Sequence, residues 1–417
     1  MSNQTFVIVG AGLAGGTAAG TLREEGFPGR VVLVGAEPHL PYERPPLSKE
    51  YLAGKKTLED AFVHPVEFYD TRDIDLRLGA PATGLDLDGH TVTLGHETIH
   101  YDRLLLATGS AARRLPPADR SGATVAYLRT IEDAERIKAG LRPERRVTVI
   151  GGGWIGLEVA AAARTAGCDV VVVEPLAEPL LRVLGPVVGR IFAKLHRSHG
   201  VEVRTSTNVT DIRSRPATGS VADGVPSVVH LDDGTATVTD LLVVGIGAIP
   251  GTDLAEAAGL KVDNGVVADE HLRTSHPDVF VAGDIANALH PKLGRSIRVE
   301  HWDNAKEQGA TAARNMLGAD EPYDRLPYFF TDQYDLGMEY VGYVGPEGYD
   351  EVVLRGDPTS GVFTAFWVTE SRVAAAMHAN DWDATPSLRN IVGAGHVDLA
   401  ALRDPQVPLD RVVPEVS

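Results

Sequence analysis

The sequence predicts an α/β protein that contains two copies of a strand–helix–strand unit and ends in a smaller α+β domain. Two glycine-rich segments with the spacing G-x-G-x-x-G, within residues 5–16 and 146–158, are the first observation. Each follows a β-branched run typical of a buried strand and precedes an alanine-rich stretch typical of a helix. A second strand then ends in an acid, Glu37 in the first copy and Glu174 in the second. The repeated order indicates two Rossmann-like dinucleotide-binding domains.

The glycines of each copy have separate structural tasks. The first makes the turn out of the strand, the second lets the backbone approach a pyrophosphate, and the third permits close contact between helix and strand. The pyrophosphate lies at the helix N-terminus, and the terminal acid accepts hydrogen bonds from ribose hydroxyls. Two bound dinucleotides are typical of an enzyme that passes a hydride between cofactors. The candidate residues are Gly10, Gly12, Ala14, Gly15 and Glu37, and then Gly151, Gly153, Ile155, Gly156 and Glu174.

Composition narrows the class of protein. The length of 417 residues allows about two to four domains. A formal net charge of −18 disfavours nucleic acid and anionic membrane surfaces as partners. No run approaches the ~18 apolar residues of a membrane span, and no secretory signal is apparent. We therefore expect a cytoplasmic protein that binds neither nucleic acid nor membrane and is a monomer or a homodimer.

The chain contains a single cysteine, Cys168. A disulfide network is therefore absent, as expected in a reducing compartment, and no C-x-x-C dithiol can relay electrons. Because Cys168 opens a β-branched strand, we expect it to be buried and inert.

The order of motifs suggests that the second unit is inserted into the first. Residues 241–251 and 279–286 resemble buried strands that reach a nucleotide at a glycine, and residues 298–317 predict a helix. From about residue 326, short alternating strands and a helix near 387–392 predict the last domain. We expect an FAD-binding domain (1–112 and 241–325), an NAD-binding domain (113–240) and a C-terminal α+β domain (326–417).

One apparent metal motif is rejected on geometry. The segment His96 to His100 matches H-E-x-x-H, which binds zinc only on a helix, where side chains i and i+4 share a face. Here it lies in a turn that enters a strand, where four residues span roughly 13 Å. We therefore expect no metal site.

The motifs together resemble those of the FAD-dependent, NADH-using ferredoxin reductases of cytochrome P450 and Rieske-type oxygenase systems, which have the glutathione reductase fold. The resemblance covers essentially the whole chain. Its most specific segments are residues 41–49 (PYERPPLSK), 107–109 (ATG), 128–134 (LRTIEDA), 151–158 (GGGWIGLE), 281–284 (VAGD) and 331–334 (TDQY).

The resemblance implies roles for further residues. On the FAD side, the first fingerprint and Glu37 would hold the adenosine diphosphate, and the other expected contacts are Arg44, Lys49, Ala82, Ala107, Thr108, Gly109, Arg129, Asp284 and Trp302. On the NAD side, the second fingerprint is joined by Glu158, Arg182 and Gly247. Asp284 could instead be a helix N-cap, a common role for Asp.

The resemblance also implies a catalytic pair, Lys49 and Glu158, that tunes the flavin and places the nicotinamide. Glu158 could also simply complement the dipole of its helix. The carboxylate of Glu174 favours NADH, because it accepts from the ribose diol and repels the 2′-phosphate of NADPH. Two positions depart from the family pattern: Phe330-Thr331 stands where Trp-Ser is usual, and Gly251 where Asn is usual.

The predicted function is the transfer of a hydride from NADH to FAD and of single electrons to a [2Fe-2S] ferredoxin, which would be a transient partner. Rubredoxin reductase, NADH oxidase and a non-catalytic flavoprotein resembling apoptosis-inducing factor remain alternatives. An acidic ferredoxin would need a local basic patch on this protein. Basic residues that follow the VAGD segment could form this patch, or they could be an ordinary solvated surface. The candidates are Lys292, Arg295, Arg298, Lys306 and Arg314.

Overall fold

The computed structural model describes residues 4–214, 226–345, 348–370, 372–394 and 396–414. The chain divides into two compact units, each formed from segments distant in sequence. The first unit contains Met1–Pro45, Lys56–Ala111 and Ala248–Pro327, and the second contains Pro46–Lys55, Ala112–Gly247 and Tyr328–Ser417.

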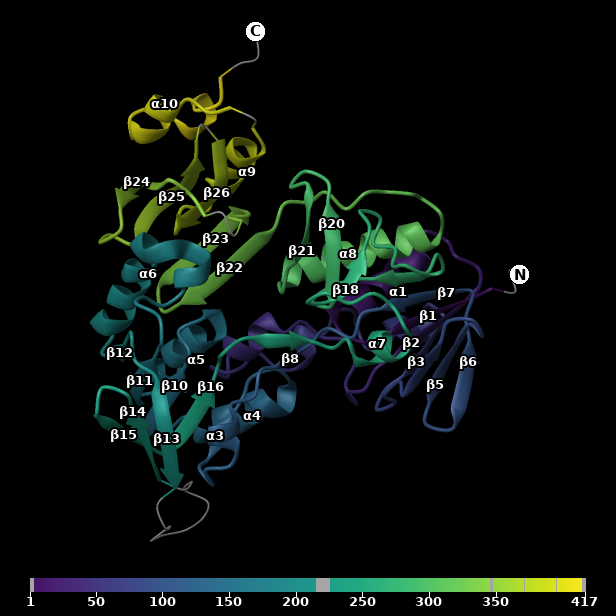
Figure 1. Ribbon diagram of the computed structural model, residues 1–417, viewed down its shortest axis with the longest axis horizontal. Helices are drawn as coiled ribbons and strands as arrows, with labels where there is room; N and C mark the ends of the chain where they lie inside the picture. The colour runs from purple at the N-terminus through teal and green to yellow at the C-terminus, as the bar shows by residue number, and fades with distance from the viewer. Residues whose placement is uncertain (1–3, 215–225, 346–347, 371, 395, 415–417) are drawn as a thin grey trace. The chain divides into compact units, whose positions relative to one another are not determined.

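The first unit is built on a five-stranded parallel sheet in the order β19-β7-β1-β2-β3. Figure 1 labels four of these strands, β7, β1, β2 and β3. The central strand has the sequence TFVIV, and four of its five residues are buried, as a strand covered on both faces requires. The strands are β1 (Thr5–Val9), β2 (Arg30–Val34), β3 (Ile74–Arg77), β7 (Arg103–Leu106) and β19 (Val279–Val281).

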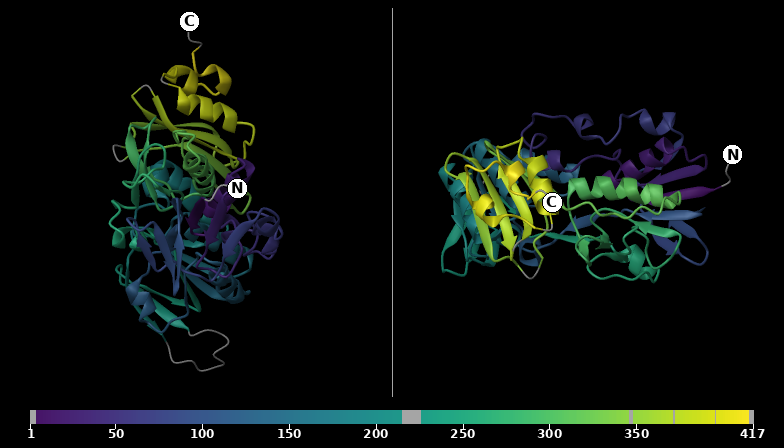
Figure 2. Two further views of the ribbon diagram at one scale, coloured as in Figure 1. Left: turned by 90° about the vertical axis from the view of Figure 1, so that its right-hand side faces the viewer. Right: turned by 90° about the horizontal axis from the view of Figure 1, so that it is seen from above.

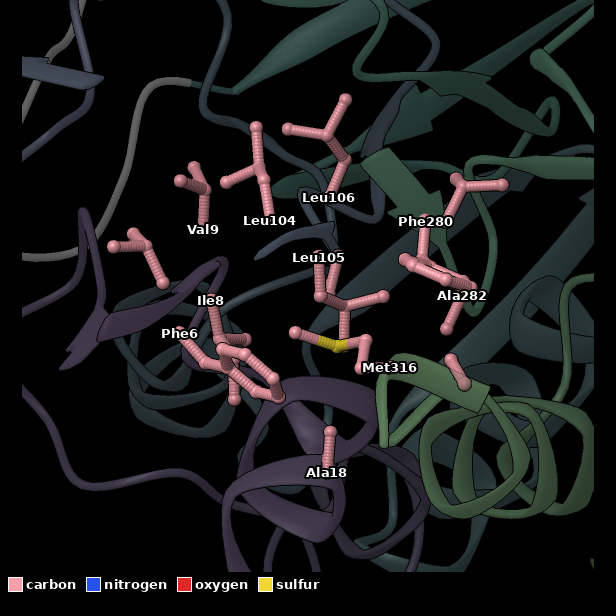
Figure 3. Packing of buried hydrophobic residues seen from close by; sticks show 14 of the residues in the cluster. Phe6, Ile8, Val9, Ala18, Leu104, Leu105, Leu106, Phe280, Ala282 and Met316 are labelled. Atoms are coloured by element: carbon pink, nitrogen blue, oxygen red, sulfur yellow. The ribbon is translucent and has the colours of Figure 1, made fainter. Parts of the chain in front are cut away.

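Helices α1 (Leu13–Glu24) and α8 (Trp302–Met316) pack against each other and against strands of this sheet. Figure 3 shows side chains of both helices among those of β1 and β7, with Met316 pointing toward Leu105. Burial of an aliphatic side chain of this kind contributes about 1.5–3 kcal/mol. The core thereby fixes the loop between β1 and α1, which carries the first fingerprint.

Smaller elements complete the first unit. One three-stranded sheet has the order β4-β5-β6 and another the order β18-β20-β21, while β8 pairs with β17. Their bounds are β4 (Gly84–Asp86), β5 (Thr91–Leu94), β6 (Glu97–His100), β8 (Ser110–Ala112), β17 (Ala248–Pro250), β18 (Val266–Ala268), β20 (Ala286–His290), β21 (Arg295–Arg298), η2 (Glu59–Ala61), α2 (Phe68–Thr71) and α7 (Asp253–Ala257). The short helix η1 (Pro45–Ser48) belongs to the second unit except for its first residue.

The second unit repeats the plan with a parallel sheet in the order β12-β11-β10-β16-β9. Helix α5 (Trp154–Thr165) packs on β10 and β11, so the second fingerprint lies between β10 and α5 as the first lies between β1 and α1. The strands are β9 (Val125–Ala126), β10 (Arg146–Ile150), β11 (Asp169–Val173), β12 (Glu202–Arg204) and β16 (Leu241–Val244).

Among the described residues, the rest of this nucleotide-binding part consists of three helices and an antiparallel sheet, β13-β14-β15. Helix α6 is kinked where Gly185 has φ +71° and Pro186 follows it. The bounds are α3 (Pro116–Asp119), α4 (Ile131–Gly140), α6 (Leu181–Ser198), β13 (Val209–Ser214), β14 (Ser227–Leu231) and β15 (Ala236–Thr239).

The C-terminal part of the second unit is an antiparallel sheet in the order β22-β23-β26-β25-β24. Helix α9 packs on β23 and β26, and α10 packs on β24. Figure 2 shows the yellow helices of this end of the chain beside the strands of the sheet. The bounds are β22 (Tyr328–Gln333), β23 (Leu336–Gly342), β24 (Glu351–Asp357), β25 (Val362–Thr369), β26 (Arg372–Ala379), α9 (Thr385–Gly393), α10 (Leu399–Arg403) and η4 (Leu409–Arg411).

Three segments differ from the sequence-based expectation. The helix expected over residues 298–317 begins at Trp302, because Arg298 ends strand β21 and His301 caps the helix by accepting a hydrogen bond from the Asp303 N–H. Residues 241–244 pair with β10 and so belong to the second unit rather than to the returning FAD segment. The C-terminal sheet shares a unit with the second fingerprint, because β22 packs on α5 and the Trp367 indole N–H donates to the Leu184 carbonyl.

Among the described helices, none combines the length and the apolar character needed to cross a bilayer.

Candidate functional site

The loop after β1 has the geometry that a pyrophosphate site requires. Gly10 has φ +118°, and a side chain there would overlap the Ala107 carbonyl. A side chain at Gly15 would overlap the carbonyl of Gly10, so both glycines are needed for the turn itself. Gly12 differs, because a Cβ built on it meets no described atom within 4 Å. Gly12 is the N-cap of helix α1, and no side chain of the described residues caps this helix end, which leaves its first N–H groups for a ligand.

Glu37, just beyond the end of β2, belongs to a three-residue cluster. Its Oε1 lies 2.8 Å from Nη2 of Arg44, and its Oε2 accepts a 2.5 Å hydrogen bond from the Tyr42 hydroxyl. That hydroxyl accepts from Nη1 of Arg44 at 2.8 Å, and burial raises the pKa of Tyr42. Sequence reasoning predicted Glu37 and Arg44 as separate contacts of one cofactor and missed Tyr42.

Asp284 follows β19 and precedes strand β20, so the helix N-cap alternative is wrong. Its Oδ2 accepts a 2.8 Å hydrogen bond from the Ser110 hydroxyl, just after the ATG segment at residues 107–109. The preceding Gly283 has φ +83° and donates its N–H to Oε1 of Gln308 on α8. A carboxylate held in this way keeps a fixed direction.

The remaining predicted FAD residues fall in both units. Trp302 is the first residue of α8, where the Lys306 ammonium lies 5.1 Å from its ring centroid, and Ala82 packs on the core of the first unit. Arg129 precedes α4 in the second unit, where its N–H donates to Asp133 of the capping box. Lys49 also belongs to the second unit.

The loop after β10 reproduces the first loop. Gly151 has φ +104°, and a side chain there would overlap the Gly245 carbonyl. A side chain at Gly156 would overlap Gly151, whereas a Cβ on Gly153 meets no described atom within 4 Å. Ile155, in the first turn of α5, is 43% exposed.

Glu174 is buried beside this loop. Its Oε2 accepts from the Gly152 N–H at 2.6 Å, and its Oε1 accepts from the Leu176 N–H at 2.8 Å. The carboxylate therefore has a fixed position next to the second glycine loop. The other two predicted NAD residues are Arg182, at the second position of α6, and Gly247, which has φ +102° and accepts a hydrogen bond from the Arg113 N–H.

Lys49 and Glu158 form a buried ion pair within the second unit. Nζ of Lys49 lies 2.8 Å from Oε1 of Glu158, and the two side chains are 10% and 5% exposed. Hydroxyl groups complete the shell of the carboxylate: Ser48 donates to Oε2 at 2.5 Å and Thr331 donates to Oε1 at 2.6 Å. Phe330 borders the pair, with its ring centroid 5.3 Å from the ammonium.

A buried carboxylate is tolerated only when it is paired and hydrogen-bonded, and Glu158 meets both conditions. Complementing a helix dipole would not require burial, a lysine and two hydroxyls, so the pair favours the functional interpretation. Sequence reasoning found Lys49 and Glu158 but missed Ser48, which adjoins Lys49 in the PYERPPLSK segment. Thr331 was noted only as a departure from the family pattern.

Two other predictions concern metals and thiols. The segment His96 to His100 lies in the β5–β6 hairpin, with Glu97–His100 as a strand, so the geometric objection to a zinc site holds. Cys168 is fully buried, its Sγ contacts the Arg142 carbonyl at 3.2 Å, and burial raises the pKa of the thiol.

His90, His276 and Asp278 also place possible ligand atoms within 4.8 Å of one another. However, Asp278 is already ion-paired with Arg103. Nδ1 of His276 accepts the Asp278 N–H at 3.2 Å. These contacts account for the cluster without a metal.

The predicted basic patch is largely compensated. Lys292 pairs with Asp324, Arg298 with Glu300 and Arg314 with Glu321, at distances of 2.5–2.9 Å. In each of these three pairs the carboxylate offsets the positive charge beside it. The patch is therefore less positive than the sequence suggested.

The two loops and the buried pair define a class of protein. Each loop offers a helix start, an open second glycine and an acid close by, which fits a dinucleotide at each. Such a chain is an oxidoreductase that uses two dinucleotide cofactors.

Comparison with known proteins identifies the family. The family model for pyridine nucleotide-disulphide oxidoreductases matches residues 4–309, and that for the reductase C-terminal domain matches residues 328–413. The chain belongs to the pyridine nucleotide-disulphide oxidoreductase family, whose ferredoxin reductase members contain FAD and use NAD(H).

Similar proteins align along nearly the whole chain. The ferredoxin–NAD(+) reductase component of the anthranilate 1,2-dioxygenase system of Burkholderia cepacia is 40% identical over 99% of this chain and 98% of its own. Putidaredoxin reductase of Pseudomonas putida is 39% identical over 99% and 97%. The reductase in the crystal structure of a covalent putidaredoxin reductase–putidaredoxin complex matches with a TM-score of 0.92, at 38% identity and 99% and 98% coverage.

Proposed function

We propose that this protein is an NADH-dependent FAD enzyme that delivers single electrons to a [2Fe-2S] ferredoxin serving a P450 or Rieske-type oxygenase. The names of its relatives, which include a dioxygenase reductase component and putidaredoxin reductase, support this assignment. When bound, FAD would accept two electrons from the nicotinamide and release them one at a time.

The chain's own residues would bind and orient the two cofactors. The first glycine loop and the side chains of Glu37 and Asp284 would hold FAD, and the second loop would hold NADH. Glu174 would select NADH, because its fixed carboxylate suits a ribose diol and repels a phosphate. The Lys49–Glu158 pair would orient the reacting rings, and alignment of this kind is the main contribution a protein makes to hydride transfer.

One observation supports the proposal that the electron acceptor is a separate molecule. The chain has a single cysteine, Cys168. It follows the C-terminal end of α5, whereas the fingerprint loop adjoins the N-terminal end, and it is fully buried with its sulfur against the Arg142 carbonyl. A redox dithiol or an exposed reactive thiol is therefore excluded. Electrons must pass to another molecule, and a one-electron iron–sulfur carrier suits a flavin. We also propose the cytoplasm as its location, where a lone thiol stays reduced.

Rapid-mixing spectroscopy tests the proposal. The purified protein is mixed with NADH or NADPH while flavin absorbance is followed, and cytochrome c reduction is measured with and without a [2Fe-2S] ferredoxin. Fast bleaching by NADH together with ferredoxin-dependent cytochrome c reduction is expected. Bleaching with oxygen as the sole competent acceptor would indicate an oxidase, and transfer to rubredoxin alone would indicate a rubredoxin reductase. Slow bleaching with a long-lived NAD complex would indicate a binding role.

A further inference from the structure

A buried series of hydrogen-bonded side chains runs from Glu158 away from Lys49. Thr331 donates its hydroxyl hydrogen to Glu158, and Nε2 of Gln333 lies 3.2 Å from the Thr331 hydroxyl. Oε1 of Gln333 lies 2.8 Å from Nε2 of His196, whose Nδ1 lies 3.3 Å from the Tyr334 hydroxyl. Thr331, Gln333 and His196 are each 0% exposed.

Residues on three secondary-structure elements make up this hydrogen-bonded series. Thr331 and Gln333 are two residues apart on β22, so their side chains emerge on the same face of the strand. Helix α5, which carries Glu158, packs on β22, and His196 is in the last turn of α6. Two polar residues of the C-terminal sheet thus connect two helices of the nucleotide-binding part.

The direction of every hydrogen bond follows from donor counting. A carboxylate cannot donate, so the single hydroxyl hydrogen of Thr331 is given to Glu158. Gln333 must then present its N–H to Thr331 and its carbonyl oxygen to His196. His196 therefore carries its hydrogen on Nε2 and accepts at Nδ1 from the Tyr334 hydroxyl. All four bonds donate toward the Glu158 carboxylate.

The electrostatic setting agrees with this order. Burial lowers the pKa of His196 to about 4, so the ring is neutral and has one N–H to donate. Burial raises the pKa of Tyr334, so its hydroxyl keeps its hydrogen. Tyr334 is fixed at φ +59°, and its ring stacks on His199 with centroids 3.7 Å apart. A non-glycine residue at positive φ is uncommon, so the surrounding contacts hold this end of the series in place.

We propose that Gln333 and His196 are positioning residues: they hold the Thr331 hydroxyl on Glu158 and thereby set the carboxylate against Lys49. This inference rests on the proposed function for its kinetic consequence, namely the placement of the nicotinamide. Neither residue touches Lys49, so both act through Thr331. Thr331→Val removes the hydroxyl at nearly constant shape, and Gln333→Met interrupts the series behind it.

The first test measures the hydrogen bond itself and does not depend on turnover. In histidine-¹⁵N-labelled protein, NMR should show His196 as the Nε2–H tautomer with a slowly exchanging proton. Gln333→Met should abolish that slow exchange. A Nδ1–H tautomer, or a fast-exchanging proton in the wild type, would overturn the proposal whatever the protein's activity.

The second test measures flavin reduction at saturating NADH and the dissociation constant for NAD⁺. Thr331→Val should slow reduction about tenfold, because a hydrogen bond to a charged group is lost. Gln333→Met and His196→Leu should each slow it about threefold to tenfold, with the NAD⁺ dissociation constant changed less than about threefold. Thr331→Ser, which keeps the hydroxyl, should restore the rate to within about twofold of wild type.

The double variant Thr331→Val/Gln333→Met decides whether Gln333 acts through Thr331. It should be no slower than Thr331→Val alone, because interacting residues give non-additive effects. Multiplied effects in the double variant, or a Thr331→Ser variant as slow as Thr331→Val, would overturn the proposal. His290→Leu, which removes a buried histidine of the first unit, controls for general destabilisation. A wild-type protein that NADH cannot reduce would contradict the proposed function but leave the NMR test standing.

Discussion

Gly12 and Gly153 occupy equivalent positions in the two nucleotide-binding parts, and their backbones are nearly identical. Each is the N-cap of a twelve-residue helix, with φ −89° and ψ −164° at Gly12 and φ −81° and ψ −176° at Gly153. Both conformations are accessible to alanine, and a Cβ on either residue meets no described atom within 4 Å. The described fold therefore does not require glycine at either position, whereas a pyrophosphate that approaches the loop backbone would.

The pair gives a matched test of which loop binds which cofactor. Gly12→Ala should fold with less bound FAD, because the methyl group blocks the approach of a pyrophosphate to the first loop. Gly153→Ala should keep its FAD and raise the dissociation constant for NAD⁺ at least about tenfold. Flavin absorbance per protein and NAD⁺ titration measure the two effects. Loss of FAD in Gly153→Ala but not in Gly12→Ala would reverse the assignment of the loops.

Removal of the negative charge from the buried pair should slow flavin reduction and also lower the melting temperature, because the buried Lys49 loses its ion-pair partner. Glu158→Gln keeps the size of the side chain but removes the charge that faces Lys49. We expect reduction at saturating NADH to slow about 10- to 100-fold, with the FAD content unchanged. Ser48→Ala, which removes one hydrogen bond and leaves the ion pair, should have a smaller effect. Equal rates in wild type and Glu158→Gln would show that the pair is purely structural.

The sequence predicted the local units well because their signals are local. The turn geometry of Gly10 and Gly151 and the strands that end before Glu37 and Glu174 follow from patterns within about 30 residues. Burial of Cys168 likewise followed from its strand context. Such features need no knowledge of which distant segments meet.

The parts that sequence reasoning missed depend on contacts between distant segments. The bond from Thr331 to Glu158 joins residues 173 positions apart, and that from His196 to Gln333 joins residues 137 apart. The TDQY segment has no periodicity that identifies its partner. The alternative in which Asp284 caps a helix failed for a related reason. Whether the residues after an aspartate form a strand or a helix depends on which sheet they join.

Glu174 provides a test of cofactor choice. Its two carboxylate oxygens accept the N–H groups of Gly152 and Leu176, so Glu174→Gln removes the negative charge together with one of these two hydrogen bonds. Glu174→Gln should lower kcat/KM for NADH about tenfold and narrow the preference over NADPH, because the repulsion of the 2′-phosphate is lost. Steady-state kinetics with both nucleotides measure the ratio. An unchanged ratio would mean that the ribose lies elsewhere.

Acid should destabilise the folded protein, and histidines that are buried or half-buried should account for part of the effect. Burial lowers the pKa of His196 to about 4, and it also lowers the pKa values of His64, His276 and His290. The unfolded chain binds a proton at each of these residues near pH 6.5, whereas the folded protein resists protonation at each until a lower pH. Their contribution to the free energy of unfolding is therefore complete above pH 6.5 and is lost as the pH falls, for His196 down to about 4.

Thermal unfolding at pH 7.5 and pH 5.5, with FAD in excess, measures this loss. At pH 5.5 the contribution of His196 alone should have fallen by about 1 kcal/mol, which corresponds to about 2–4 °C in Tm for a unit of this size. His196→Leu should melt lower than wild type at pH 7.5, because Gln333 loses its partner, yet shift less between the two pH values. An acid shift in His196→Leu as large as in wild type would show that His196 is not protonated on unfolding in this range.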